Sequence, residues 1–223
     1  MGYLVQARGD AISPPTTVFV LRLLGAVGSS VAFGLIAALA WSPWNFWLAF
    51  GLGFVFGTAF VTGTGYRILI AVARNQLASA PASWSGASAG ACIGAFAVWL
   101  ATVIGSGEGA FVLLALGIAI NLAYLPVKAA CRLKDCCGAL VALGGIDLRL
   151  AEIAATVVVL AAAGAVASAG FTSPAASIAI AGHLLVRLAS RRLRGRWSWG
   201  WPPLSQPGAE LTPLALLTVL SLL

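Results

Sequence analysis

The residues most suggestive of chemistry are one serine and the chain's only histidine. Ser88 lies in Gly86-Ala-Ser88-Ala-Gly90, a Gly-x-Ser-x-Gly pattern of the kind that presents a nucleophilic serine at a sharp turn. Such a serine needs a base to accept its proton, and His183 is the single histidine among the 223 residues. Ser88 and His183 therefore define one hypothesis, an intramembrane serine hydrolase.

Two short segments carry a family resemblance. Gly86-Ala-Ser88 before a helix of small residues, with Gly182-His183-Leu184 later, resembles the rhomboid intramembrane proteases. The resemblance implies Ser88 as nucleophile and His183 as general base. It covers about a dozen residues, and Ala89 follows the serine where that family has glycine. On a helix, Ser88 points about 200° away from Gly86. We therefore favour a non-catalytic role, with Ser88 a small polar residue of a packing helix.

The glycines around Ser88 have a simpler explanation. Gly86, Gly90 and Gly94 recur every fourth residue, so they share one face of a helix. Gly53 and Gly57 repeat this spacing in an earlier apolar run. Faces without side chains let two backbones approach closely, which helps hold helices together in a bilayer. These five glycines are predicted to be helix-packing positions.

Three polar residues within apolar runs suggest a solute pathway. Thr62 lies in the segment Thr62-Gly-Thr-Gly65, and Asn121 and His183 lie in later runs. Ionisable and polar groups at membrane depth often mark transport pathways. A permease or channel lined by Thr62, Asn121 and His183 is therefore an alternative hypothesis.

No cofactor is predicted. A lone histidine cannot supply bis-histidine haem ligation, and Met1 is the only methionine, although a single pigment or metal on His183 is left open. Cys131, Cys136 and Cys137 form Cys-x4-Cys-Cys, which is not a zinc-site spacing. Their role is left open, and no metal site is predicted.

The elements that position these residues are set by composition. Hydrophobic residues make up 61% of the chain, charged residues 9%, and the mean hydropathy is +1.00. A soluble domain carries about 25% charged residues, so this chain lacks the polar surface needed in water. The sequence predicts an all-α, polytopic transmembrane helix bundle with the lipid bilayer as its surroundings. The net charge of +7 lies beside apolar runs, so no nucleic-acid partner is expected.

The apolar runs predict six spans within one transmembrane domain, residues 1–223. They cover about 18–41, 46–70, 86–104, 110–127, 153–170 and 174–189. Residues 128–150 are predicted to be a cytoplasmic loop, and 190–223 a C-terminal tail at the interface. The segment 211–223 is too short to span unaided, and we expect it to be interfacial, re-entrant or bound to a partner.

Charge predicts the orientation. The turns at 42–45, 105–109 and 170–173 contain no Lys or Arg, whereas the alternate segments hold all of them. The positive-inside rule then places both termini in the cytoplasm, with the protein in a membrane that we take to be the bacterial cytoplasmic membrane.

Three functions follow from these observations. The first is a non-catalytic subunit or scaffold of a larger membrane assembly, packed through its glycine faces against other membrane subunits or a second copy. The second is the permease or channel, and the third is the hydrolase. The sequence favours the first, and it names neither a substrate nor a process.

Overall fold

The structure, a computed structural model, describes residues 15–41, 45–73, 84–106, 108–134, 142–143, 145–193 and 206–222. Its helices are α1 (Pro15–Ala37), α2 (Phe46–Ala73), α3 (Trp84–Ser106), α4 (Ala110–Lys134), α5 (Leu148–Ser168), α6 (Thr172–Leu193) and α7 (Gln206–Leu222). A 3-10 turn, η1 (Ala38–Ala40), extends α1, and two short strands, β1 (Ala142–Leu143) and β2 (Ile146–Asp147), pair antiparallel. The expected all-α architecture is confirmed.

Six of these helices are long and apolar enough to cross a membrane. Large apolar side chains also cover much of the outside of the bundle, among them Phe19, Phe50, Phe54, Ile104, Val158 and Leu185. In water such a surface would drive aggregation, whereas a bilayer solvates it. The six spans and their apolar exterior fit an integral membrane protein.

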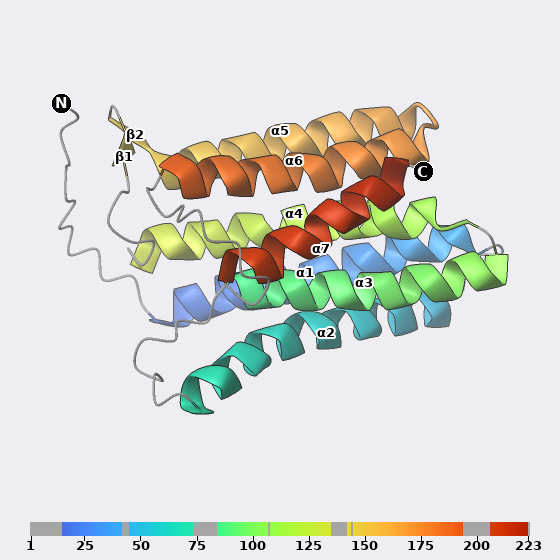
Figure 1. Cartoon of the computed structure of the whole chain (residues 1–223), viewed down its shortest axis with the longest axis horizontal. Helices are drawn as coiled ribbons and strands as arrows, with labels where there is room; N and C mark the ends of the chain where they lie inside the picture. Colours follow the sequence, from blue (N-terminus) through green and yellow to red (C-terminus); the bar gives the residue numbers. More distant parts are fainter. Residues whose placement is uncertain are drawn as a thin grey trace.

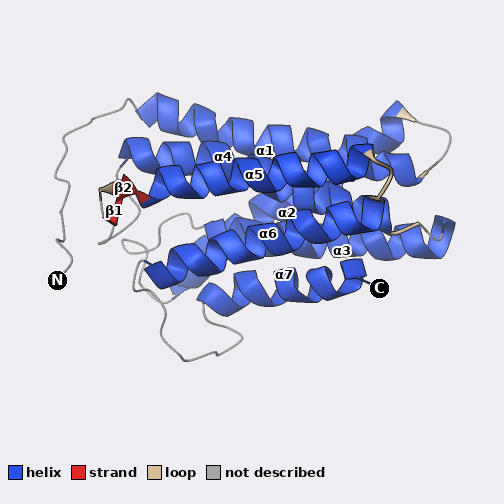
Figure 2. Ribbon diagram, turned by 90° about the horizontal axis from the view of Figure 1, so that it is seen from above, coloured by secondary structure: helices blue, strands red, loops and turns tan. Residues whose placement is uncertain are grey.

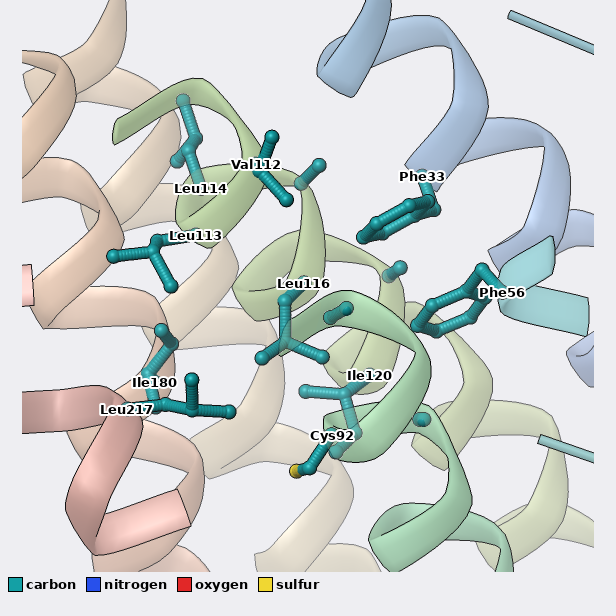
Figure 3. Close-up of a cluster of buried hydrophobic side chains, with 14 of the residues drawn as sticks. Phe33, Phe56, Cys92, Val112, Leu113, Leu114, Leu116, Ile120, Ile180 and Leu217 are labelled. Atoms are coloured by element: carbon teal, nitrogen blue, oxygen red, sulfur yellow. The ribbon is translucent and has the colours of Figure 1, made fainter. Parts of the chain in front are cut away.

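The long helices run alongside one another, and α4 lies at the centre (Figures 1 and 2). It contacts α1, α3, α5, α6 and α7, whereas α2 packs against α1 and α3. The core fills the middle of this arrangement with side chains from α1 to α4, α6 and α7 (Figure 3). Leu116, Ile120 and Ile180 are fully buried there, and Phe33 stacks on Phe56 with ring centroids 4.4 Å apart.

The predicted glycine positions lie at contacts between helices of this chain. A Cβ added to Gly90 would collide with the carbonyl oxygen of Ala59, and one on Gly94 would lie 2.7 Å from Ala59 Cβ. A Cβ on Gly53 would lie 2.6 Å from the Ser30 carbonyl oxygen, and one on Gly57 would lie 2.6 Å from the Ser30 hydroxyl. These faces are therefore occupied by α1 and α2 themselves, which removes them as surfaces for another subunit.

The segment predicted as a loop over 128–150 is shorter in the structure. Helix α4 continues to Lys134, and α5 already begins at Leu148. Between these two helices, where the structure describes the segment, lies the β1–β2 hairpin, with Gly145 at φ +83° in the turn. The difference arises because α4 continues as a helix beyond its last apolar run. Its final turns carry charged side chains, which the hydropathy of the sequence assigns to a loop.

The C-terminal segment is a helix packed along the bundle. Leu211, Leu214 and Leu217 of α7 are buried against α3 and α6. Near its end, the Ser221 carbonyl accepts hydrogen bonds from Ser173 (2.7 Å) and Ser177 (3.0 Å) at the start of α6. Helix α7 thus runs from the end where α6 finishes to the end where α6 begins (Figure 1).

This course of α7 bears on the predicted placement of both termini. With 17 residues, α7 is about 25 Å long, close to the thickness of a bilayer core. Ser221 therefore lies at the end of the bundle opposite to the start of α1 (Figure 1). The placement of both termini in the cytoplasm stays a prediction.

Candidate functional site

The α4–α6 interface carries a row of polar side chains. Asn121, Tyr124 and Lys128 share one face of α4 because they lie at i, i+3 and i+7. Arg187 and Ser190 follow His183 on α6 at i+4 and i+7, and they share a face for the same reason. All six of these side chains are buried, and we call them, together with Glu152 of α5, the polar ladder.

The inner end of the ladder is an Asn–His pair. The Asn121 amide nitrogen donates to the Gly117 carbonyl at 2.8 Å and to the Ala179 carbonyl of α6 at 2.9 Å. Since carbonyl oxygens only accept, these two bonds fix the amide orientation and turn its oxygen toward His183 Nδ1 at 3.0 Å. His183 Nδ1 is therefore the donor of this bond, which fixes the tautomer of the neutral ring.

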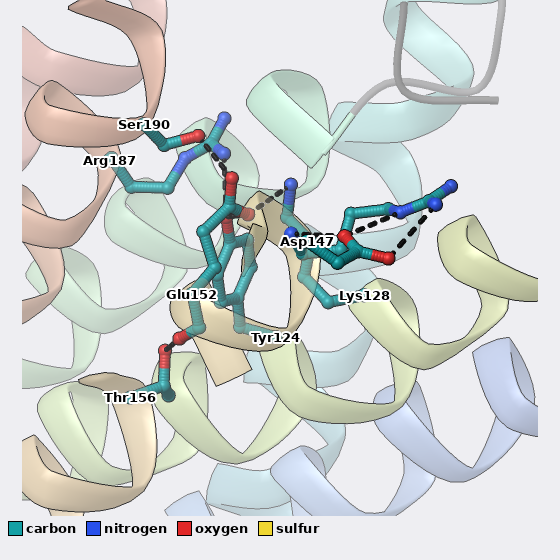
Figure 4. A network of polar contacts seen from close by, with 8 residues as sticks. Tyr124, Lys128, Asp147, Glu152, Thr156, Arg187 and Ser190 are labelled. Atoms are coloured by element: carbon teal, nitrogen blue, oxygen red, sulfur yellow. Dashed lines mark hydrogen bonds and ion pairs between the residues drawn. The ribbon is translucent and has the colours of Figure 1, made fainter. Parts of the chain in front are cut away.

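The outer end is built around Glu152 (Figure 4). Its carboxylate forms an ion pair with Lys128, accepts a hydrogen bond from Ser190, and accepts one from the Tyr124 hydroxyl at 2.7 Å. Arg187 in turn donates to the Tyr124 hydroxyl at 2.8 Å. The phenol thus bridges an anion and a cation, and three helices meet at one carboxylate.

Aromatic rings enclose the middle of the ladder. The Tyr124 ring lies edge-on to His183 with centroids 5.1 Å apart, and Trp84 of α3 lies 5.0 Å from Tyr124 and 6.0 Å from His183. The Lys128 ammonium and the Arg187 guanidinium lie 5.1 Å and 5.2 Å from the centre of the Tyr124 ring. These rings keep the charges in an environment of low polarity, which strengthens electrostatic interactions there.

Local sequence explains how Glu152 is held. Asp147 caps α5 by accepting from the Arg149 backbone N–H at 2.8 Å, which starts the helix one turn before Glu152. The Arg149 side chain returns to the same carboxylate at 3.1 Å, and Arg132 of α4 lies 3.6 Å from it. Partial burial raises the pKa of Asp147, but the hydrogen bonds from Arg149 and the charges of Arg149 and Arg132 outweigh it and lower the pKa below 3.8.

The same interface is apolar beyond the ladder. From Asn121 toward the start of α4, the buried side chains are Ile120, Leu116, Leu113 and Val112, and Ile180 of α6 lies in the same cluster (Figure 3). Polar groups therefore reach from the charged end of the bundle to about the middle of α4 and stop there. One half of the interface offers charges and proton-exchanging groups, and the other half is closed by hydrocarbon.

The residues predicted from sequence fall in different places. Asn121 and His183 come together as described, whereas Thr62 is exposed on α2. Ser88 is fully buried on α3, and its hydroxyl has no hydrogen-bond partner in the part of the chain that the structure describes. Ser88 and His183 therefore do not form a dyad. Cys131 is half-buried, while Cys136 and Cys137 lie outside the described residues.

Sequence reasoning missed the outer half of the ladder. Lys128 is the first residue of the predicted loop 128–150, and Glu152 lies at the start of the fifth apolar run. Tyr124 and Arg187 were not singled out as partners. One signal was present: Lys128, Tyr124 and Asn121 have helical spacing, as have Arg187 and His183. Among the described residues, no group of three His, Cys, Asp or Glu is placed to hold a metal ion.

Fold and site together define the class of this protein: a polytopic helical membrane protein whose central helices share a buried, charged polar ladder. No family model, curated protein or solved structure matches the chain.

Proposed function

We propose that the protein is a proton-coupled permease for a small solute, with the polar ladder as its proton-exchanging element. The observation that carries the proposal is the half-polar, half-apolar interface between α4 and α6. Buried ionisable groups within membrane spans are costly and mark ion or proton pathways by default. A polar row that enters from one end and stops at a hydrocarbon barrier is what a pathway closed on one side requires.

Glu152 is the group best placed to exchange a proton. It accepts from Tyr124 and Ser190 and pairs with Lys128, so its protonation would remove the charge that draws three helices together. Protonation would therefore favour one of two arrangements of the helices over the other. A carrier couples proton binding to movement through such a shift. Asn121 and His183 extend the polar surface inward from this carboxylate.

The distribution of positive charge indicates which end of the bundle faces the cytoplasm. The Lys and Arg side chains that the structure describes, Arg22, Lys128, Arg132, Arg149, Arg187, Arg191 and Arg192, all lie at the end where α1, α3 and α5 begin. The positive-inside rule then makes this the cytoplasmic end, and the ladder would open toward the cytoplasm.

Proton flux into liposomes tests the proposal. Purified protein is reconstituted with an internal pH dye, and flux is followed under an imposed membrane potential, alone and with a panel of small carboxylates, amino acids and sugars. We expect flux above that of empty liposomes, reduced at least tenfold in Glu152→Gln and in Tyr124→Phe. Glu108→Gln, at the opposite end and exposed, is the matched control and keeps the wild-type rate. Flux equal to that of empty liposomes under every condition would refute the proposal.

A subunit of a membrane assembly is the second candidate. It is favoured by α5, which is the least buried of the six spans. The outer face of α5 is rich in alanine, and a Cβ added to Gly164 would have no atom within 4 Å. A face of small residues lets another helix pack closely against it. Purification in mild detergent followed by native mass spectrometry tests it. A second copy or a stoichiometric membrane protein supports this candidate, and a monomer contradicts it.

A further inference from the structure

Helix α6 carries polar side chains on both sides of one apolar stretch. From His183, where the polar ladder ends, the helix leads back to Ile180, which is fully buried, and then to Ser177 and Ser173. Ser177 and His183 are six residues apart, which is about 9 Å along a helix. The hydrocarbon between the ladder and the next polar side chains of α6 is therefore less than two helical turns thick.

The two serines contact the end of α7. Ser173 donates to the Ser221 carbonyl at 2.7 Å, and the Ser177 hydroxyl lies 3.0 Å from the same carbonyl and 2.9 Å from the Ser221 hydroxyl. We call Ser173, Ser177 and Ser221 the serine latch. It lies at the end of the bundle opposite to the charged groups of the ladder, because α6 begins and α7 ends there (Figure 1).

At the level of the apolar stretch, α6 is held more tightly by α4 than by α7. A Cβ added to Gly117 of α4 would lie 2.5 Å from Ala179 Cβ and 3.3 Å from Ile180 Cγ1. The Asn121 amide also donates to the Ala179 carbonyl at 2.9 Å. On the side of α7, Ile180 shares its buried cluster with the side chain of Leu217 (Figure 3). A route outward from the ladder therefore opens more easily between α6 and α7 than between α4 and α6.

The serine latch can open without leaving a hydroxyl unpaired. A hydroxyl has one proton, and that of Ser177 has three acceptors within reach, one of which is the Ser173 carbonyl of its own helix at 3.1 Å. The Ser221 hydroxyl likewise donates to the Thr218 carbonyl within α7 at 2.7 Å. These bonds persist when α7 separates from α6, and Ser173 and Ser177 are half-buried, so water can replace the bonds that are lost.

We propose that the outer half of the solute pathway lies between α6 and α7, with the serine latch as its gate and Ile180 as the barrier behind the gate. The proposal rests on the permease function and states how the closed side of the pathway opens. Movement of the end of α7 away from α6 would separate Leu217 from Ile180 and connect the serines to the polar ladder.

Access to the barrier tests the gate without relying on transport. The full-length protein, with its four native cysteines replaced by alanine or serine, carries Ile180→Cys and is reconstituted into liposomes. A membrane-impermeant thiol reagent is added on both sides. Labelling is compared between the intact latch, Ser173→Ala with Ser177→Ala, and Ser168→Ala. Ser168 is the matched control, because it donates to the Ala165 carbonyl of its own helix at 2.8 Å.

We expect the thiol at position 180 to be labelled at least tenfold faster when both latch serines of α6 are alanine. Ser168→Ala is expected to leave the rate unchanged. Equal rates in the three proteins would overturn the gate.

A reversible cross-link tests whether transport needs the gate. Ser177→Cys with Ser221→Cys, in the same background without native cysteines, puts thiols where two hydroxyl oxygens lie 2.9 Å apart, so a small adjustment allows a disulfide. We expect oxidation to reduce proton flux at least tenfold and dithiothreitol to restore it, whereas the two single variants do not respond. Undiminished flux with the disulfide formed, as verified by mass spectrometry, would overturn the gate and leave the permease standing. Flux absent even from the wild type would instead refute the permease, on which the gate rests.

Discussion

Replacing Glu152 with alanine tests the energetic role of the ladder most directly. The carboxylate is 5% exposed and Lys128 is 7% exposed, so little water screens their interaction. Removing one partner of a buried ion pair costs about 3–5 kcal/mol, because the remaining charge stays in a medium that solvates it poorly. The hydrogen bonds from Tyr124 and Ser190 are lost in the same step.

The expected effect is large enough to read from thermal unfolding. For a chain of this size, 1 kcal/mol corresponds to about 2–4 °C, so Glu152→Ala is expected to lower Tm by about 6–20 °C. Circular dichroism of the protein in detergent measures this change. Glu108→Ala, at an exposed position, serves as the control and is expected to change the stability by less than about 0.5 kcal/mol.

A double variant separates charge from packing. Combining Glu152→Leu with Lys128→Met replaces the pair with apolar side chains of similar length, which in other buried pairs is often neutral. We expect the double variant to regain more than half of the stability that Glu152→Ala loses, with Arg187 and Tyr124 still hydrogen-bonded to each other. A loss below about 1 kcal/mol in Glu152→Ala, or a double variant no more stable than the single, would refute the reasoning.

Three further predictions concern the framework. Gly90→Leu forces side-chain atoms toward the Ala59 carbonyl and is expected to cost about 1–3 kcal/mol, whereas Gly164→Leu, at an open position, is nearly neutral; equal Tm values would contradict this. Asp147→Ala removes a helix cap worth about 0.5–2 kcal/mol. Because the pKa of Asp147 is lowered, its charged form stabilises the fold above pH 3.8 and this contribution is lost as the pH falls below it. Stability measured from neutral to acidic pH should therefore fall less in Asp147→Asn than in the wild type, and equal slopes would argue against it. Ser177→Ala removes hydrogen bonds to the end of α7 and should speed amide exchange there, with unchanged exchange as the opposing result.

The spans could be predicted from sequence because hydropathy alone sets them. Six apolar helices were expected and six are present, and the polar residues inside them, Asn121 and His183, stand out against apolar neighbours. The ends of the helices were harder to predict, because a helix can continue past its last apolar residue where its charged side chains form ion pairs or hydrogen bonds. Lys128 is helical and buried for this reason, although a lysine after an apolar run normally marks a span boundary.

The partners within the site could not be predicted. Glu152 meets Tyr124 and Ser190 from sequence distances of 28 and 38 residues, and no local pattern encodes those contacts. The glycine faces show the opposite limit. Their spacing predicts shared helix faces, but only the packing shows that Gly53 and Gly57 meet α1 and that Gly90 and Gly94 meet α2.

The central helix α4 is continuous from Ala110 to Lys134 and contains a proline, Pro126. Pro126 has no N–H to donate to the carbonyl four residues earlier, so the helix is weakest between Asn121 and Lys128. Gly25 of α1 accommodates the ring, since a Cβ there would lie 3.1 Å from Pro126 Cγ. The part of α4 before Pro126 contributes apolar side chains to the core, and the part after it carries Lys128. A bend at Pro126 would move the segment that carries Lys128 while the apolar segment before it stays packed. This is a movement that the proposed proton coupling could use.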